Sequence, residues 1–126
     1  MKKTKFDLGM ENLNLIDGDG GQAVIDSLKN IAPDAGKYIV EFAFGEIYSR
    51  ENLTLQEKEL ITITSLLSIG GCEKQLNVHI NASLNIGISP KKIIDTFIQC
   101  IPYVGFPRVL NAIFEAKEIF QNKKLI

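Results

Sequence analysis

Apolar side chains recur along most of this chain every three or four residues, which is the period of a helix that buries one face. The pattern is present in segments 22–30 and 33–48, and Pro33 stands where a first helical turn tolerates proline. The apolar residues are Ala23, Val24, Ile25 and Leu28 in the first segment and Tyr38, Ile39, Phe42, Ala43 and Phe44 in the second. Both segments are therefore predicted to be helices.

The segment 54–69 is predicted to be a helix that lies buried at the centre of the fold. Thr54 is followed three residues later by Glu57, the spacing of a capping box that satisfies free N–H groups at a helix start. After Glu59 no charged residue occurs until Glu73, which indicates burial. The segment is rich in β-branched residues, but it is much longer than the ~5–6 residues of a usual strand.

Three further helices are predicted in the second half of the chain. Gly70-Gly71 interrupts the pattern, and a helix is expected over 73–86. The next begins at Ser89-Pro90, with serine as the N-cap and proline in the first turn, and stops near Pro102. The last spans 107–121. No strand pair is evident, so the fold class is all-α, a bundle of about six helices with short connections.

Residues 1–20 are predicted to be an N-terminal extension of a single domain that spans 1–126. The run Asp17–Gly21 is rich in glycine and aspartate and is interpreted as a turn or loop. Four apolar residues precede it and lie outside the predicted helices, namely Phe6, Leu8, Leu13 and Leu15. We expect them to dock on a neighbouring subunit of an oligomer.

Composition narrows the possible functions. With 14 basic and 15 acidic residues the net charge is −1, and this balance shows no electrostatic footprint for nucleic acid. No apolar run approaches the ~20 residues that span a bilayer, and no signal peptide is evident, so a cytoplasmic protein without membrane contact is expected. One histidine and two distant cysteines, Cys72 and Cys100, indicate no metal site within one subunit. No glycine-rich phosphate loop indicates a cofactor.

Several motifs, taken together, resemble the carboxymuconolactone decarboxylase family. They are Phe44-Gly-Glu-Ile-Tyr-Ser-Arg50 with Leu53, Glu57-Lys-Glu-Leu-Ile-Thr62, Gly70-Gly-Cys-Glu-Lys-Gln-Leu-Asn-Val-His-Ile-Asn-Ala-Ser-Leu-Asn-Ile-Gly87, Ser89-Pro90-Lys-Lys-Ile-Ile94, Tyr103-Val-Gly-Phe-Pro107 and Leu110-Asn-Ala112. The similarity covers about residues 18–120. Each motif is weak alone, and the combination is specific.

The resemblance implies an AhpD-like helical fold whose subunits assemble into dimers and commonly hexamers. It also implies a carboxy-lyase that removes carbon dioxide from 4-carboxymuconolactone, or from a related small carboxylated lactone, in the breakdown of aromatic acids. A sister branch of the family contains alkylhydroperoxidase-like proteins, which reduce peroxides with a Cys-x-x-Cys pair, a histidine and a glutamate. A helical oligomer without catalytic activity is a third interpretation, because fold does not determine function.

The resemblance also assigns roles to individual residues. Glu59, Cys72 and His79 fall on the glutamate, the first cysteine and the histidine of the peroxidase branch, and Gln75 falls where the second cysteine should be. Thiol exchange needs a second thiol close enough to form a disulfide, and Cys100 belongs to a different helix. The decarboxylase branch is therefore preferred to a peroxidase that uses Cys72.

His79 is the best candidate for the chemistry, with Glu59 and Cys72 as further catalytic candidates. Decarboxylation of such a lactone leaves electron density on a carbon that must receive a proton, and a histidine with a pKa near ~6.5 transfers protons at neutral pH. Glu59 is either a partner that orients His79 or a first-turn glutamate stabilised by the helix dipole. Cys72 is either a thiol in the pocket or a small buried apolar residue.

Three residues are candidates for binding a small acid. Arg50 and Arg108 could each hold a carboxylate through paired hydrogen bonds, and Arg108 stands where the family pattern more often has a small residue. Gln75 shares one predicted helix face with Cys72 and His79. That face, which also carries Leu76 and Ser83, is either a pocket wall or a subunit contact.

Overall fold

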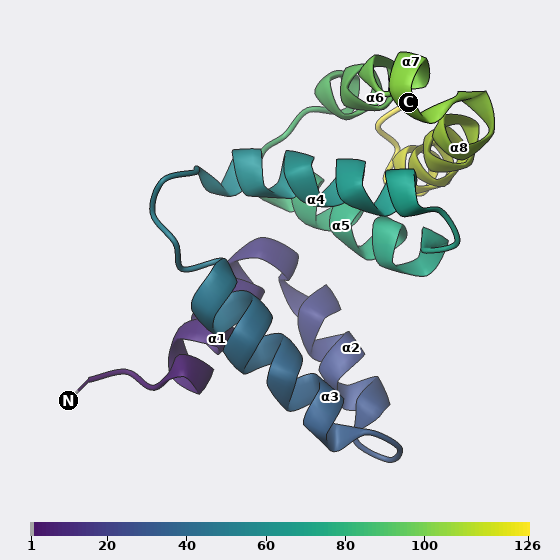
Figure 1. Cartoon of the computed structure of the whole chain (residues 1–126). Coiled ribbons are helices and arrows are strands. Elements are labelled where there is room, and N and C mark those ends of the chain that lie inside the picture. The colour runs from purple at the N-terminus through teal and green to yellow at the C-terminus, as the bar shows by residue number, and fades with distance from the viewer. Residues whose placement is uncertain (1) are drawn as a thin grey trace. The chain divides into compact units, whose positions relative to one another are not determined.

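The protein is described by a computed structural model over residues 2–126, in which all regular structure is helical (Figure 1). The elements are α1 (Lys5–Asp17), α2 (Asp19–Leu28), α3 (Pro33–Tyr38), the π-helix η1 (Ile39–Ile47), α4 (Leu55–Ile69), α5 (Glu73–Asn85), α6 (Pro90–Gln99), α7 (Ile101–Val104) and α8 (Phe106–Asn122). No strand occurs in the described residues, so the predicted all-α class is confirmed. The helices are more numerous than the six predicted.

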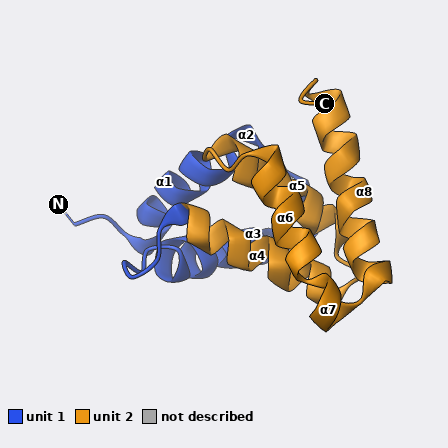
Figure 2. Cartoon of the chain, turned by 90° about the horizontal axis from the view of Figure 1, so that it is seen from above, with its two compact units in different colours: residues 1–55 blue, residues 56–126 orange. Residues whose placement is uncertain are grey.

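The chain divides into two compact units, one ending at Leu55 and the other beginning at Gln56 (Figure 2). The first contains α1, α2, α3 and η1, and the second contains α4 to α8. Each unit has its own packed helices, and each is described separately below. The single domain expected over 1–126 remains a prediction.

The first unit corrects part of the prediction for residues 1–20, because α1 was not among the predicted helices. Thr4 caps α1 with a capping box in which its hydroxyl accepts from the Asp7 N–H and the Asp7 carboxylate accepts from the Thr4 N–H. The predicted loop at Asp17–Gly21 is also wrong, because only Gly18 separates α1 from α2. Gly18 has a φ of 56°, and this left-handed conformation turns the chain within one residue.

The apolar residues of α1 also differ from the prediction. Leu13 and Ile16 are buried within the chain, whereas Phe6 and Leu15 are exposed and Leu8 is half-buried. The expectation that Leu13 docks on a neighbouring subunit is therefore wrong. Leu13 and Ile16 lie three residues apart, so they share one face of α1. The polar residues around them in the sequence obscured this spacing.

Segment 33–48 is helical as predicted, but α3 continues directly into the π-helix η1. The wider π turn closes with bonds from residue i+5, as in the Tyr48 N–H donating to the Ala43 carbonyl at 2.9 Å. The Asn12 side chain donates to the Phe44 carbonyl at 2.6 Å and to the Ser49 hydroxyl at 3.0 Å. A cross-helix partner thus satisfies a carbonyl of the π-helix.

In the second unit, α4, α5, α6 and α8 lie where the apolar pattern predicted helices. Its core is formed by one face of each: Ile63 and Leu67 of α4, Leu76 and Ile80 of α5, Ile93 and Phe97 of α6, and Val109, Ala112 and Ala116 of α8. The side chains of α4 correct the expectation of a helix buried on all sides. Ile61 and Ile69 are 52% and 64% exposed, so only one face of α4 is buried.

The turns between these helices follow their sequence signals. Gly70 and Gly71 connect α4 to α5. Their φ angles are 74° and 73°, a conformation that favours glycine. The Ser89 hydroxyl accepts from the Lys92 N–H at 3.1 Å and caps α6 as predicted. Pro102 does not end the helical region, because it lies in the first turn of the short helix α7.

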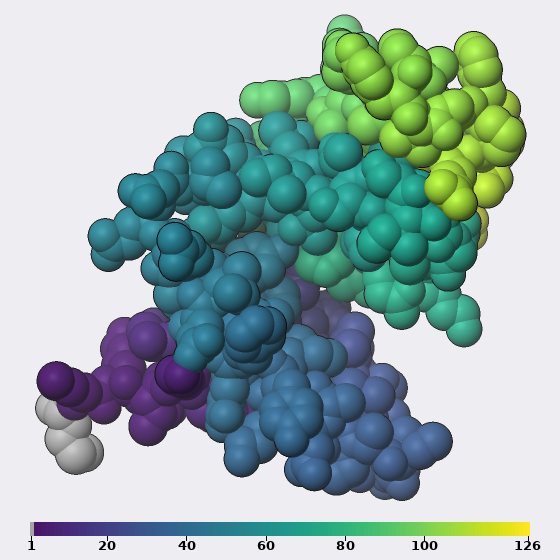
Figure 3. All heavy atoms as spheres, in the orientation of Figure 1, coloured from purple at the N-terminus to yellow at the C-terminus, as the bar shows by residue number. Residues whose placement is uncertain are grey.

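Several large apolar side chains on α7 and α8 are exposed to solvent. Phe106 and Phe114 lie eight residues apart on α8, and Tyr103 of α7 is 84% exposed. The surface formed by these helices is visible in green and yellow-green in Figure 3. The expected homo-oligomer remains a prediction. Within the described residues, no helix has both the length and the apolar character needed to cross a membrane.

Candidate active site

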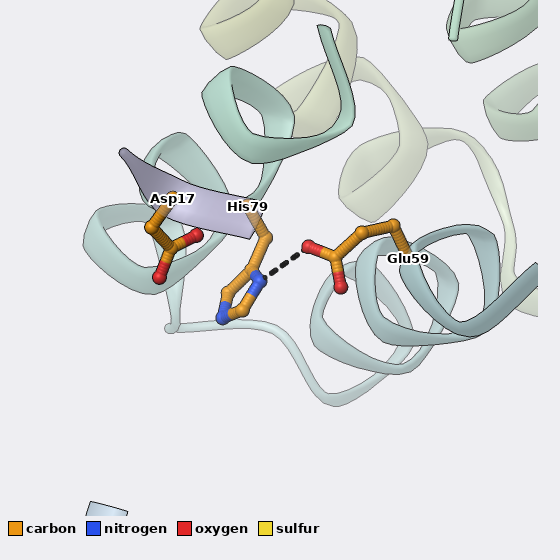
Figure 4. A group of neighbouring side chains, drawn as sticks. All are labelled: Asp17, Glu59 and His79. Atoms are coloured by element: carbon orange, nitrogen blue, oxygen red, sulfur yellow. Dashed lines mark hydrogen bonds and ion pairs between the residues drawn. The ribbon is translucent and has the colours of Figure 1, made fainter. Parts of the chain in front are cut away.

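The side chains of Glu59 and His79 form a hydrogen-bonded pair between α4 and α5 (Figure 4). His79 Nδ1 lies 2.8 Å from Glu59 Oε1. The Glu59 side chain has no exposed surface, and that of His79 is 19% exposed. Both residues belong to the second compact unit, so the pair is contained within it. The sequence resemblance named both residues, and the structure places them in direct contact.

The position of Glu59 on its helix explains its burial. Glu59, Ile63 and Leu67 are spaced four residues apart and form the buried face of α4. Glu59 is fully buried, whereas Glu57, two residues earlier, is exposed. A carboxylate in such surroundings is costly unless it is hydrogen-bonded, and the imidazole of His79 supplies one partner.

His79 is held by contacts of the α5 backbone as well as by Glu59. The Ser83 hydroxyl, which is fully buried, donates to the His79 carbonyl at 2.7 Å. The adjacent Ile80 is also fully buried in the core. The sequence analysis placed Ser83 near His79 but missed this contact, for which the spacing of four residues was the available signal.

The geometry allows the pair to hold and transfer a proton. When Nδ1 carries a hydrogen, it donates to the Glu59 carboxylate. The second ring nitrogen, Nε2, lies on the other side of the ring and is not used in this hydrogen bond. A carboxylate at 2.8 Å also stabilises the imidazolium that forms when both nitrogens are protonated. The arrangement is thus suited to general acid–base chemistry.

Cys72 and Arg108 lie together at a different place in the second unit. Both line a hollow of about 10 Å³ between the α4–α5 turn and α8, together with Leu66, Leu67, Gly70, Glu73, Leu76, Asn111 and Ala112. A hollow of this size holds about one water molecule and does not admit a lactone. Cys72 is the N-cap residue of α5, and its thiol lies 3.6 Å from the Gly70 carbonyl. Both cysteines are free thiols.

Arg108 interacts with the end of α4. Its Nη1 donates to the Ser68 carbonyl at 3.0 Å, and the guanidinium packs against Gly70, where a Cβ would lie 2.8 Å from Nε. The last carbonyls of a helix have no partner within the helix, and a cation near them is favourable. This contact was not predicted, and it gives Arg108 a structural partner within its own chain.

The remaining candidates are spread over the surface. Gln75 of α5 is exposed, one turn before His79, and Arg50 is exposed in the loop that follows η1. The predicted polar face of α5 is not continuous, because Leu76 and Ser83 are buried. Those two residues pack inside the chain, and Leu76 also lines the small hollow beside Cys72.

In the second unit, Glu59 and His79 offer two ligand atoms that a metal ion could share. Beside the Glu59 carboxylate, the imidazole of His79 can also take up and release a proton.

The chain is thus an all-helical protein with a buried carboxylate–imidazole pair between two adjacent helices. Residues 33–118 match the family model described as carboxymuconolactone decarboxylase family. The chain is 31% identical over 98 residues to a 4-carboxymuconolactone decarboxylase of Acinetobacter baylyi, covering 78% of this chain and 72% of that protein. It is 24% identical over 95 residues to an uncharacterized 15.0 kDa protein of Paracoccus denitrificans, covering 75% and 71%. The chain belongs to the carboxymuconolactone decarboxylase family.

Proposed function

We propose that the protein is a cofactor-independent carboxy-lyase that acts on 4-carboxymuconolactone or a related small carboxylated lactone. The observation that carries the proposal is the hydrogen bond of 2.8 Å between His79 and the buried Glu59. The similarity to a relative named 4-carboxymuconolactone decarboxylase supports the choice of substrate class. We further propose that the protein works as a homo-oligomer in the cytoplasm.

In the proposed reaction the bond between the substrate's carboxylate carbon and the lactone ring breaks, and carbon dioxide leaves. The electron pair of that bond passes into the ring and toward the lactone carbonyl, giving a dienolate. A ring carbon then takes a proton from His79 Nε2 to form the enol-lactone. One proton is consumed in each turnover, and the partial exposure of His79 allows its return from solvent.

Glu59 acts through His79 in this proposal and is therefore a positioning residue. Its carboxylate fixes the imidazole ring through Nδ1 and stabilises the imidazolium before the proton leaves Nε2. Because Glu59 is fully buried, this interaction is screened little by water.

The substrate-binding residues are proposed in the same way. Gln75 precedes His79 by one turn of α5, so an amide on that surface lies near the proton donor. Arg50 and Arg108 supply positive charge for the substrate's acid groups, and Arg108 would have to exchange its contact with the Ser68 carbonyl. Cys72 lies about 10 Å from His79 along the helix axis, at about 1.5 Å per residue, so its thiol takes no part in the proton transfer of this proposal.

The test is turnover of 4-carboxymuconolactone by the purified protein, followed through the loss of its ultraviolet absorbance. We expect the wild-type protein to be active and His79→Ala to lose about 10²–10⁴-fold in rate, the usual contribution of a positioned acid or base. Circular dichroism should show the same helical content in both. Wild-type activity in a folded His79→Ala protein would refute the proposal.

The thiol peroxidase alternative makes the opposite prediction for the cysteine. Cys72→Ser should leave decarboxylation within a few-fold of wild type, whereas a peroxidase that uses this thiol would lose all peroxide reduction with a thiol reductant. If the protein consumes peroxide and does not turn over the lactone, the decarboxylase proposal is wrong and Cys72 is the nucleophile.

A further inference from the structure

A cleft of about 420 Å³ lies between α6 and α8, away from the residues considered so far. It shares no lining residue with the Glu59–His79 pair, and all of its residues belong to the second unit. Its volume is in the range of about 300–1,000 Å³ that is usual for small-molecule sites. The cleft is therefore large enough to hold an organic ligand.

The cleft arises from the way in which the two helices pack. Ile93 and Phe97 of α6 enter the core beside the small residues Ala112 and Ala116 of α8. Ile94 and Ile113, each next to one of these core residues in sequence, are only half-buried and line the cleft. Ile94 and Ile113 therefore form an apolar floor of the cleft, beside the contact between α6 and α8.

The segment after α8 forms a further wall of the cleft. Lys124 has a φ of 57°, and its N–H donates to the Gln121 carbonyl at 3.0 Å. The Leu125 N–H donates to the Phe120 carbonyl at 2.8 Å, which completes the two-bond pattern of a Schellman motif. This turn leads to Ile126, which also lines the cleft. The wall is therefore held by backbone hydrogen bonds.

The charged residues of the cleft favour an anion. Lys91 of α6 and Lys117 of α8 line it, and Asp95 is the one acidic side chain in the lining. Within residues 2–126 neither lysine forms an ion pair. Pro90, also in the lining, is the first residue of α6, so the positive end of that helix dipole faces the same region. An apolar floor with two lysines matches a ligand that is both apolar and negatively charged.

We propose that this cleft binds a small organic acid whose apolar body lies on Ile94, Ile113 and Phe120 and whose carboxylate faces Lys91 and Lys117. The proposal does not depend on decarboxylation, because the site contains no residue of the catalytic pair. Binding of a ligand in this cleft is expected to leave the hydrogen bond between His79 and Glu59 unchanged.

The experiment is a titration of the full chain with octanoate, below its micelle concentration, monitored by NMR of labelled isoleucine methyl groups. We expect saturable shifts at Ile94, Ile113 and Ile126 and little change at Ile63 and Ile80, which lie in the core. Octanamide, which has the same chain without the charge, should bind about fivefold more weakly, as expected for loss of an exposed charge interaction. Equal affinity for both compounds would overturn the proposal.

Lysine variants test the charge recognition directly. Lys91→Ala and Lys117→Ala should each weaken octanoate binding about fivefold, while Lys92→Ala, an exposed neighbour outside the lining, should stay within twofold. All three side chains are exposed, so the melting temperatures should match that of the wild type. If the same methyl groups shift with protein concentration alone, a second copy of the chain covers the cleft and the proposal is wrong.

Discussion

Replacing Glu59 by glutamine should separate the catalytic role of the pair from its structural role. The variant keeps the volume of the side chain and an oxygen that can accept from Nδ1 of His79, while it removes the charge and replaces the other oxygen with an NH2 donor. A hydrogen bond to a charged group contributes about 1.5–3 kcal/mol and a neutral one about 0.5–1.5 kcal/mol. Because the pair is buried, the difference of about 1–1.5 kcal/mol should be expressed almost fully.

If the carboxylate stabilises the imidazolium that precedes proton transfer, this difference appears in the rate. A change of about 1.4 kcal/mol is a factor of about ten, so kcat of Glu59→Gln should fall about tenfold. Stability should change by less than about 1 kcal/mol, because the weaker hydrogen bond is offset by the lower cost of burying a neutral amide in place of a carboxylate. Glu59→Ala should differ, because a cavity beside an unsatisfied imidazole costs about 2–5 kcal/mol.

The assay combines kcat for 4-carboxymuconolactone with urea denaturation of the same preparations. Glu57→Gln is the matched control, since Glu57 lies on the same helix and is exposed. Its kcat should be that of the wild type, and its stability should fall by no more than about 1 kcal/mol, the usual contribution of a carboxylate in a first helical turn. A Glu59→Gln protein with wild-type kcat would refute the reasoning that the charge of Glu59 acts in the reaction. A large loss of stability with unchanged kcat would assign the pair to folding alone.

Three further substitutions test the packing. Gly9→Ala should destabilise the protein by about 1–3 kcal/mol, because a Cβ there overlaps the Val40 carbonyl, and an unchanged urea midpoint would contradict this close approach. Ser89→Ala should destabilise the protein by about 1 kcal/mol, because the hydrogen bond from the Lys92 N–H is lost, and the melting temperature should fall. An unchanged melting temperature would mean that this cap does not stabilise the protein. Phe97→Ala should cost about 3–5 kcal/mol, because Phe97 is fully buried, and a loss below 1 kcal/mol would mean that the site collapses freely.

The helices of the second unit could be predicted because their sequence signals are local. Ser89 and Pro90 mark the start of α6, and the Gly70-Gly71 pair marks the turn before α5, so neither depends on distant residues. The same reasoning failed near the N-terminus. Asp17, Gly18 and Asp19 have the composition of a loop, yet the chain needs only Gly18 to turn between two helices.

The π-helix shows a different limit of sequence reasoning. Residues 39–47 have the apolar spacing of an ordinary helix, and nothing local distinguishes a bond to residue i+5 from one to residue i+4. The wider turn is supported from outside the helix, where Asn12 of α1 donates to the Phe44 carbonyl. A contact between residues so far apart in sequence depends on tertiary packing, and the sequence pattern does not contain it.

The Glu59–His79 pair lies between these two cases. The burial of Glu59 was available from periodicity, because Ile63 and Leu67 at four-residue steps place it on an apolar face, whereas Glu57 is turned about 200° away on the helix. Predicting the contact of Glu59 with His79 needs a further argument about how the two helices pack. Two helices joined by a short turn run antiparallel, so residues at similar distances from that turn come opposite each other. Glu59 and His79 lie at such distances on either side of Gly70-Gly71, and the short turn is therefore part of what builds the site.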